Sequence, residues 1–73
     1  MQNQFDFQVV SSAQLGAFII QRGDRLRDIF SRKTYKVEGV YKDNKGDNLL
    51  YGYYDDDPSA KVYLPVRNFE MLK

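Results

Sequence analysis

Residues 34–41 read Thr-Tyr-Lys-Val-Glu-Gly-Val-Tyr, and this stretch decides the fold class of the 73-residue chain. Tyr35 and Val37 are apolar at alternate positions, which is the period-two pattern of a strand with one buried face. Beyond Gly39 the apolar parity changes, because Val40 is the next apolar residue, and a change of parity at a glycine indicates a β-bulge. The stretch therefore predicts one long strand that contains a bulge.

On the N-terminal side of this strand, residues 23–24 (Gly-Asp) form a turn that starts another strand. In residues 25–27 (Arg-Leu-Arg), Leu26 faces inward and the two arginines face solvent. Residues 31–33 (Ser-Arg-Lys) make a tight connection into residues 34–41. Short strands joined by turns at this spacing predict an antiparallel barrel or sandwich.

On the C-terminal side, residues 43–48 are rich in Asp, Asn and Gly and predict a hairpin loop. Residues 55–59 close a second turn, and Pro65 restricts the strand that contains it to a sheet edge or a bend. Phe69 and Leu72 are expected to be buried. The remaining elements are two strands, followed by a 3₁₀ turn that runs into a short final strand: residues 49–54, 61–66 and 68–72.

Residues 1–21 form an N-terminal arm. Phe5, Phe7 and Val9 alternate with polar residues, which predicts a half-buried strand at its start.

Two interpretations stay open for residues 13–20. In the first, Ser11 or Ser12 caps a short helix with three apolar side chains on one face: Leu15, Phe18 and Ile19. Gly16 disfavours that helix by about 1 kcal/mol. In the second, the chain forms another extended segment that ends in the β-forming run Phe-Ile-Ile. We therefore predict a strand followed by a short helix or an extended segment.

Four short motifs resemble those of the SH3-like barrels: Gly23-Asp24-Arg25, Tyr35-Lys36-Val37, Val62-Tyr63-Leu64 and Asn68-Phe69-Glu70-Met71-Leu72. More particularly, residues 23–72 are similar to the plasmid-borne type II dihydrofolate reductases, small chains that assemble as tetramers around one active-site pore. The resemblance implies an all-β fold in which residues 22–73 form a small SH3-like barrel of about five strands. It also implies an accessory protein of a phage or other mobile element that modulates a host factor.

The chain departs from the reductase family at the positions that bind substrates. In that family, folate and nicotinamide contacts come from a Val-Gln-Ile-Tyr strand and from a Lys just after the Arg of the opening motif. Here residues 61–64 read Lys-Val-Tyr-Leu, and Asp28 or Ile29 stands where the Lys is expected. A tetrameric reductase-like enzyme is therefore the third hypothesis for function, behind two that involve no catalysis.

Composition excludes several kinds of chemistry. The chain has no Cys and no His, so disulfides, an imidazole general base and the usual zinc ligands are absent. No pair of carboxylates has a spacing that ties it to one cleft, and we expect no catalytic residue, cofactor or metal. The apolar run at residues 15–20 is too short for a signal sequence or a membrane span, which predicts a cytoplasmic protein without membrane contact.

Residues 55–57 are consecutive aspartates, and carboxylate oxygens are the ligands that Ca²⁺ and Mg²⁺ prefer. Neighbours in sequence do not converge easily on one ion. We interpret the run as a solvated acidic turn whose charge influences the choice of partner.

The preferred hypothesis rests on the aromatic content. Six Tyr and five Phe make up 15% of the chain, more than a core of this size requires. Exposed tyrosines are typical of interfaces, because they are large, stiff and able to hydrogen-bond. We therefore expect a non-enzymatic module that binds a protein partner, or a second copy of itself, through exposed aromatic residues and the apolar arm. The candidate partner-binding residues are Tyr41, Tyr53, Tyr54, Tyr63 and Phe18.

The alternative hypothesis rests on local charge. The chain as a whole has a net charge of +1, but residues 22–36 hold six basic residues against Asp24 and Asp28, a local net charge of +4. This predicts a nucleic-acid-binding barrel in which cations hold phosphates while Tyr35 or Tyr41 stacks on bases. Its candidate residues are Arg25, Arg27, Arg32, Lys33 and Lys36, beside Arg22.

Overall fold

A computed structural model describes residues 7–72 of the chain as eight strands and one 3₁₀ turn. The elements are β1 (Gln8–Val10), β2 (Ser12–Leu15), β3 (Phe18–Gln21), β4 (Arg25–Asp28), β5 (Thr34–Lys42), β6 (Asn48–Tyr54), β7 (Val62–Pro65), η1 (Val66–Asn68) and β8 (Phe69–Met71). Every strand pair is antiparallel, and residues 7–72 contain no α-helix. The all-β class predicted from the sequence is confirmed.

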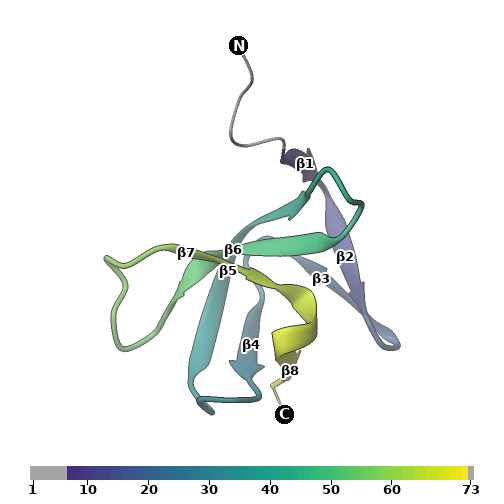
Figure 1. Ribbon diagram of the computed structural model, residues 1–73. Helices are drawn as coiled ribbons and strands as arrows, with labels where there is room; N and C mark the ends of the chain where they lie inside the picture. Colours follow the sequence, from purple (N-terminus) through teal and green to yellow (C-terminus); the bar gives the residue numbers. More distant parts are fainter. Residues whose placement is uncertain (1–6, 73) are drawn as a thin grey trace.

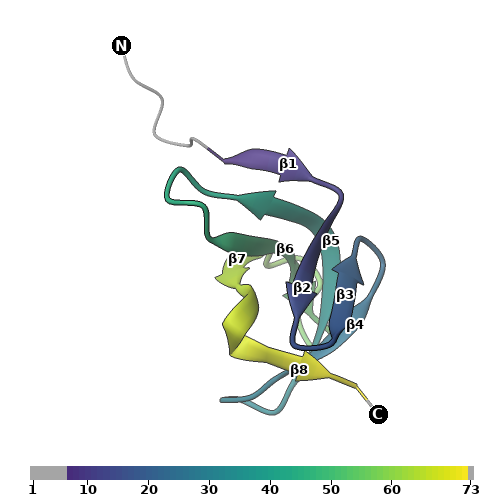
Figure 2. The same ribbon diagram turned by 90° about the vertical axis from the view of Figure 1, so that its right-hand side faces the viewer.

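The sheet is organised on β5. β6 pairs with β5 along one edge, and the other edge is shared by β4 at residues 34–36 and β1 at residues 40–42. The order across the sheet is β7-β6-β5-β4-β8, and β2 and β3 form a separate hairpin. The sheet is strongly curved in Figure 1, and Figure 2 shows the β2–β3 hairpin packed beside β5.

The predicted bulge in β5 is present. The register of β5 against β6 shifts between Val37 and Gly39, so Glu38 has no partner in β6. Tyr35 and Val37 point into the core before the bulge, and Val40 points into it afterwards. The extra residue therefore keeps one face of a bent strand against the core along its whole length.

The core contains nine buried apolar side chains: Ala13, Ile20, Leu26, Tyr35, Val37, Val40, Leu50, Val66 and Phe69. Tyr35 is the largest, and its hydroxyl donates to the carbonyl oxygens of Leu50 at 3.2 Å and Val62 at 2.9 Å. Burial raises the pKa of this phenol, with smaller contributions from Tyr54, Tyr51 and Glu38, so it stays a neutral donor. Among residues 7–72, no buried side-chain nitrogen or oxygen lacks a partner.

The predicted short helix in the arm is wrong, and the extended alternative is confirmed. Ala13 pairs with Ile20, and Leu15 with Phe18, so β2 and β3 form a hairpin closed by two residues. The first of these, Gly16, has a φ of +61°. A positive φ at the first central position is the requirement of a type II′ turn, which suits the twist of paired strands. The glycine that disfavours a helix is therefore the residue that this hairpin needs.

The predicted first strand exists, but it is oriented differently from the expectation. Val10 packs against the core, whereas Val9 is 75% exposed and faces away from it. Pairing of β1 with β5 sets this orientation, because Val10 lies opposite the buried Val40. Phe5, which the sequence pattern places in the same strand, lies outside the described residues.

Most C-terminal predictions are confirmed. β7 is an edge strand that ends at Pro65, and the 3₁₀ turn that follows leads into the short strand β8. The turn begins slightly earlier than expected, at Val66. Phe69 is buried as predicted, whereas Leu72 is only half-buried.

Gly52 lies opposite Val37, at a point where no side chain fits between β6 and β5. A Cβ at this position would overlap the backbone carbonyl oxygen of Lys36, whose strand is paired on both sides. We expect Gly52→Ala to lower the free energy of unfolding by about 3 kcal/mol or more, because the backbone must shift to relieve the overlap. Urea denaturation of the purified variant measures this loss.

Gly39→Ala is the matched control, since Gly39 lies in the same strand pair. The three atoms nearest to a Cβ there all belong to the side chain of Tyr41, the closest at 2.8 Å, and a side chain can rotate away. We expect this control to cost less than about 1.5 kcal/mol. Equal losses for the two variants would contradict the assignment of Gly52 to a backbone contact.

Candidate functional site

The outward side of the sheet carries an aromatic face. Strand register places its members within strands on the side opposite the core, because paired residues share a face and alternate residues change face. Phe7, the residue before β1, joins them through its ring contact with Tyr63. Gly39 lies among them and has no side chain, so the ring of Tyr41 lies over it. The aromatic face consists of Phe7, Val9, Tyr41, Leu49, Tyr51 and Tyr63.

The rings of this face pack around Tyr63, with Phe7 and Tyr41 edge to face and Tyr51 tilted against it. Its ring centroid lies 4.7 Å from that of Tyr51, 5.6 Å from Tyr41 and 5.2 Å from Phe7. Tyr41 and Tyr51 are also neighbours, at 6.5 Å with nearly perpendicular rings. Such pairs each contribute about 0.5–1.5 kcal/mol beyond the area they bury. The rings therefore hold one another in place while Tyr63 stays 41% exposed.

The aromatic face carries no formal charge at neutral pH. Burial raises the pKa of Tyr63, and the neighbouring Tyr41 and Tyr51 raise it further, which keeps this hydroxyl protonated. Val9 and Leu49 add aliphatic surface to the same side. The result is an amphipathic surface of rings and hydroxyls, of the composition that interface cores favour.

A charged boundary lies beside the aromatic face. Lys61 forms an ion pair with Glu38, with 2.7 Å between Nζ and Oε1, and its ammonium group lies 5.5 Å from the ring centroid of Tyr53. The hydrogen bond to Glu38 raises the pKa of Lys61. Tyr53 shares the outward side of β6 with Tyr51, but it contacts this cation rather than the ring cluster.

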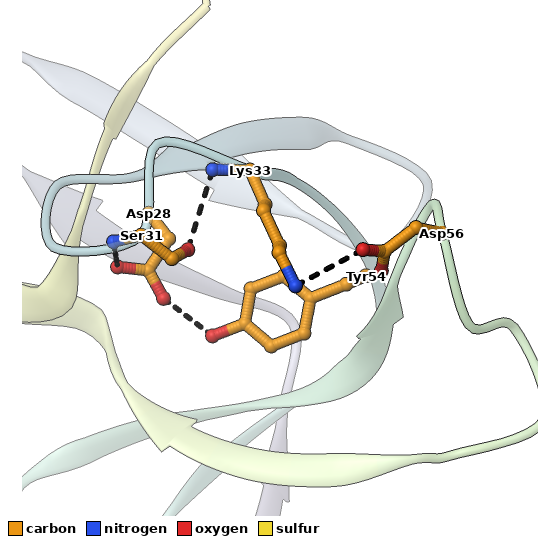
Figure 3. A network of polar contacts seen from close by, with 5 residues as sticks. All are labelled: Asp28, Ser31, Lys33, Tyr54 and Asp56. Carbon is orange, nitrogen blue, oxygen red and sulfur yellow. Dashed lines mark hydrogen bonds and ion pairs between the residues drawn. The ribbon is translucent and has the colours of Figure 1, made fainter.

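Tyr54 faces the other way and belongs to a polar network, which Figure 3 shows. Its hydroxyl donates to Oδ2 of Asp28, and its ring lies 5.4 Å from that of the buried Tyr35. The other oxygen of Asp28, Oδ1, accepts the backbone N–H groups of Phe30 at 2.8 Å and Ser31 at 3.1 Å. The network fixes the turn between β4 and β5 and uses the hydroxyl of Tyr54, which the strand register places on the inward side opposite Tyr35.

Asp28 is the single charged side chain among the buried residues that the structure describes, with 5% of its surface exposed. Burial alone would raise its pKa, but the hydrogen bonds from Tyr54, Phe30 and Ser31 outweigh that effect and lower it. Burial and the adjacent Asp28 raise the pKa of Tyr54 to about 12. The pair is therefore a carboxylate and a neutral phenol over the whole neutral range.

Phe18 is exposed at the tip of the β2–β3 hairpin, with 55% of its surface accessible. That hairpin contributes Ala13 and Ile20 to the core and thus lies on the inward side of the sheet. The structure therefore brings Tyr41 and Tyr63 together, places Tyr53 at their boundary, and separates Tyr54 and Phe18 from them.

Three of the six predicted basic residues lie on the outward side of β4 and β5, namely Arg25, Arg27 and Lys36, and Arg25 is paired across the strands with Lys36. The acidic turn reaches two of the six. Asp55 forms an ion pair with Arg25, and Asp56 lies 3.0 Å from Nζ of Lys33.

Two shallow depressions contain the other predicted cations. The first is lined by Arg22, Gly23, Lys36, Val37 and Glu38, and the second by Arg27, Arg32, Glu70 and Met71. Tyr35, one of the two tyrosines expected beside these cations, is fully buried.

Sequence reasoning did not include Phe7, Leu49 or Tyr51 among the candidate partner-binding residues, although Phe7 belongs to the apolar arm that was expected to contact a partner. The signal for Tyr51 was present, because the alternation in β6 places it on the same side as Tyr53. Phe7 joins the cluster only through the pairing of β1 with the far half of β5, which no local pattern reveals.

Comparison with known proteins finds no matching protein-family model, no similar curated protein and no similar solved structure. Within residues 7–72, no three His, Cys, Asp or Glu side chains are placed to hold a metal ion. The same part of the chain has no helix long and apolar enough to cross a membrane.

Tyr54→Phe tests the network through its pH dependence. The pKa of Asp28 is lower in the folded protein than its ordinary value of 3.8, so the ionised carboxylate stabilises the fold at a pH above 3.8. This stabilisation is lost as the pH falls through the pKa of Asp28 in the folded protein. At neutral pH we expect the variant to lose about 1.5–3 kcal/mol, the contribution of a hydrogen bond to a charged group. The difference from the unmodified protein should narrow on acidification, measured by urea denaturation over a pH series.

Tyr53→Phe is the control for this measurement, because its ring contacts Lys61 and lies away from Asp28. We expect the free energy of unfolding of this control to differ from that of the unmodified protein by a small and nearly constant amount at every pH. If the loss of unfolding free energy in Tyr54→Phe stays constant on acidification, the hydrogen bond from Tyr54 does not stabilise the ionised form of Asp28.

Proposed function

We propose that the protein is a non-enzymatic binding module that engages a protein partner through the aromatic face. The observation that carries this proposal is the packing of four rings, from β5, β6, β7 and the residue before β1, on the side of the sheet that faces away from the core. These rings do not fill the core, because the nine buried apolar side chains of the core lie on the opposite side of the sheet and include none of them.

The chemistry of the face supports a protein partner. Tyrosine rings offer large contact areas at low entropic cost, and their hydroxyls offer donors and acceptors at the edge of the contact. The rings are already ordered by one another, so binding costs little additional side-chain entropy. We further propose an SH3-like barrel as the scaffold, since β4 to β8 cover the range in which the sequence resembles that fold.

The proposal extends to cellular role. We propose a cytoplasmic accessory protein of a phage or other mobile element that acts on a host factor, on the basis of the resemblance to such chains.

Capture from a lysate of the source organism, followed by mass spectrometry, tests the aromatic face. We expect Tyr63→Lys to reduce recovery of specific partners by about tenfold or more, because a charge in the centre of an interface removes a dominant contact. Phe30→Lys is the control, since Phe30 is 75% exposed at the β4–β5 turn, outside the aromatic face. Identical partner sets for both variants and the unmodified protein would reject the proposal.

Sedimentation of the purified protein decides whether a second copy is the partner. Self-association through the face predicts a mass that rises above the 8.6 kDa of one chain with concentration and falls back in Tyr63→Lys. If the mass stays at 8.6 kDa at every concentration, self-association is rejected, and the partner is then a different protein.

A further inference from the structure

The depression beside the aromatic face is positively charged. Arg22 and Lys36 line it together with Gly23, Val37 and Glu38. Glu38 is already paired with Lys61, whereas no ion pair to Arg22 or Lys36 occurs among residues 7–72. Lys36 also lies directly across from Arg25, whose charge is already paired with Asp55, so Lys36 and Arg22 are the cations at this depression that remain without an ion pair among residues 7–72.

The neighbouring ion pairs indicate which anion suits this surface. Arg25 holds the carboxylate of Asp55, and Lys33 holds that of Asp56, so two adjacent acidic side chains of an exposed turn already bind cations of the basic strip, which consists of Arg25, Lys33 and Lys36. Arg22 and Lys36 offer the same chemistry without such a partner. Because Asp55 and Asp56 already neutralise Arg25 and Lys33, a long polyphosphate backbone would find few unpaired cations beside the depression, whereas a single carboxylate needs only Arg22 and Lys36.

Lys36, which lines the depression, and the aromatic face lie on the same side of β5. Gly39, under the ring of Tyr41, and Lys36 are three residues apart in that strand, with the bulge at Glu38 between them. At roughly 3.3 Å per residue this separation is about 10 Å, which is the span of about three residues of an extended peptide. One extended segment can therefore reach both surfaces.

We propose that the partner of this protein presents an extended acidic segment, in which an Asp or Glu side chain binds between Arg22 and Lys36. An aromatic or aliphatic side chain about three residues away in that segment contacts the aromatic face. This inference rests on the proposed function and specifies the chemistry of the partner.

Selection of a random dodecapeptide phage library on the immobilised full-length protein tests the inference. We expect the selected peptides to be enriched in Asp or Glu at a fixed distance from an aromatic or aliphatic residue. Synthetic peptides of that kind should bind the double variant Arg22→Glu, Lys36→Glu at least about tenfold more weakly, since two ion pairs are lost and replaced by repulsion. Changing the acidic residue of the peptide to its amide should cause a similar loss.

The double variant Arg32→Glu, Arg67→Glu is the control, because it changes the net charge equally at two exposed cations outside the depression. We expect it to bind the peptides within about twofold of the unmodified protein, below the size of a typical exposed ion pair. Circular dichroism and urea denaturation of both variants confirm that each is folded.

Three results would overturn the inference. The first is a selection without acidic enrichment, and the second is an equal loss in both double variants. The third is tighter binding of a thymidine oligonucleotide than of any peptide, lost only in Arg22→Glu, Lys36→Glu, which would assign the depression to nucleic acid. Peptides that need Tyr63 but not Arg22 or Lys36 would reject this inference and still support the proposed function.

Discussion

The bulge at Glu38 is the constraint on which the rest of the structure depends. A nine-residue strand with strict alternation would place Val40 on the side opposite Tyr35 and Val37, and the core would lose one of its central members. One extra residue restores the inward orientation and bends the strand. The bend also leaves two short stretches on the second edge of β5, which β4 and β1 occupy separately.

The same bulge separates two chemically different surfaces on the outward side. On one side of Glu38 the outward positions belong to rings and aliphatic groups, and on the other they belong to Lys36, Arg25 and Tyr53, whose ring contacts the cation of Lys61. Glu38 itself has no partner in β6, which leaves its side chain available to hold Lys61. A feature that the core requires therefore also determines where the apolar surface ends and the charged surface begins.

The sequence predicts those parts of the fold in which one periodicity dominates. The pattern of Tyr35, Val37 and Val40 around Gly39 allows a single interpretation, and the bulge follows from it. Leu15, Phe18 and Ile19 fit one face of a helix, although Leu15 and Phe18 also fit the last pair of a hairpin. Gly16 decides between these outcomes through its positive φ, a property of the folded chain that its identity alone does not specify.

The candidate site is less accessible to sequence reasoning, because it is assembled from separate strands. Tyr41 and Tyr63 follow from alternation, but Phe7 reaches Tyr63 only because β1 pairs with the far half of β5. Tyr54 resembles its neighbour Tyr53 in sequence, yet it faces Asp28, so its hydroxyl is used within the fold.

The exposed ion pairs of the basic strip bear on specificity more than on stability. The side chains of Arg25 and Asp55 are 54% and 39% exposed, and pairs of this kind contribute at most about 1 kcal/mol to folding. Their larger effect is on which negatively charged partners can bind to the basic strip. By holding Asp55 and Asp56 against the strip, they lower its attraction for a continuous polyanion and leave the two cations of the depression, Arg22 and Lys36, for a short acidic segment. A near-neutral chain can in this way retain one selective positive site beside an uncharged aromatic face.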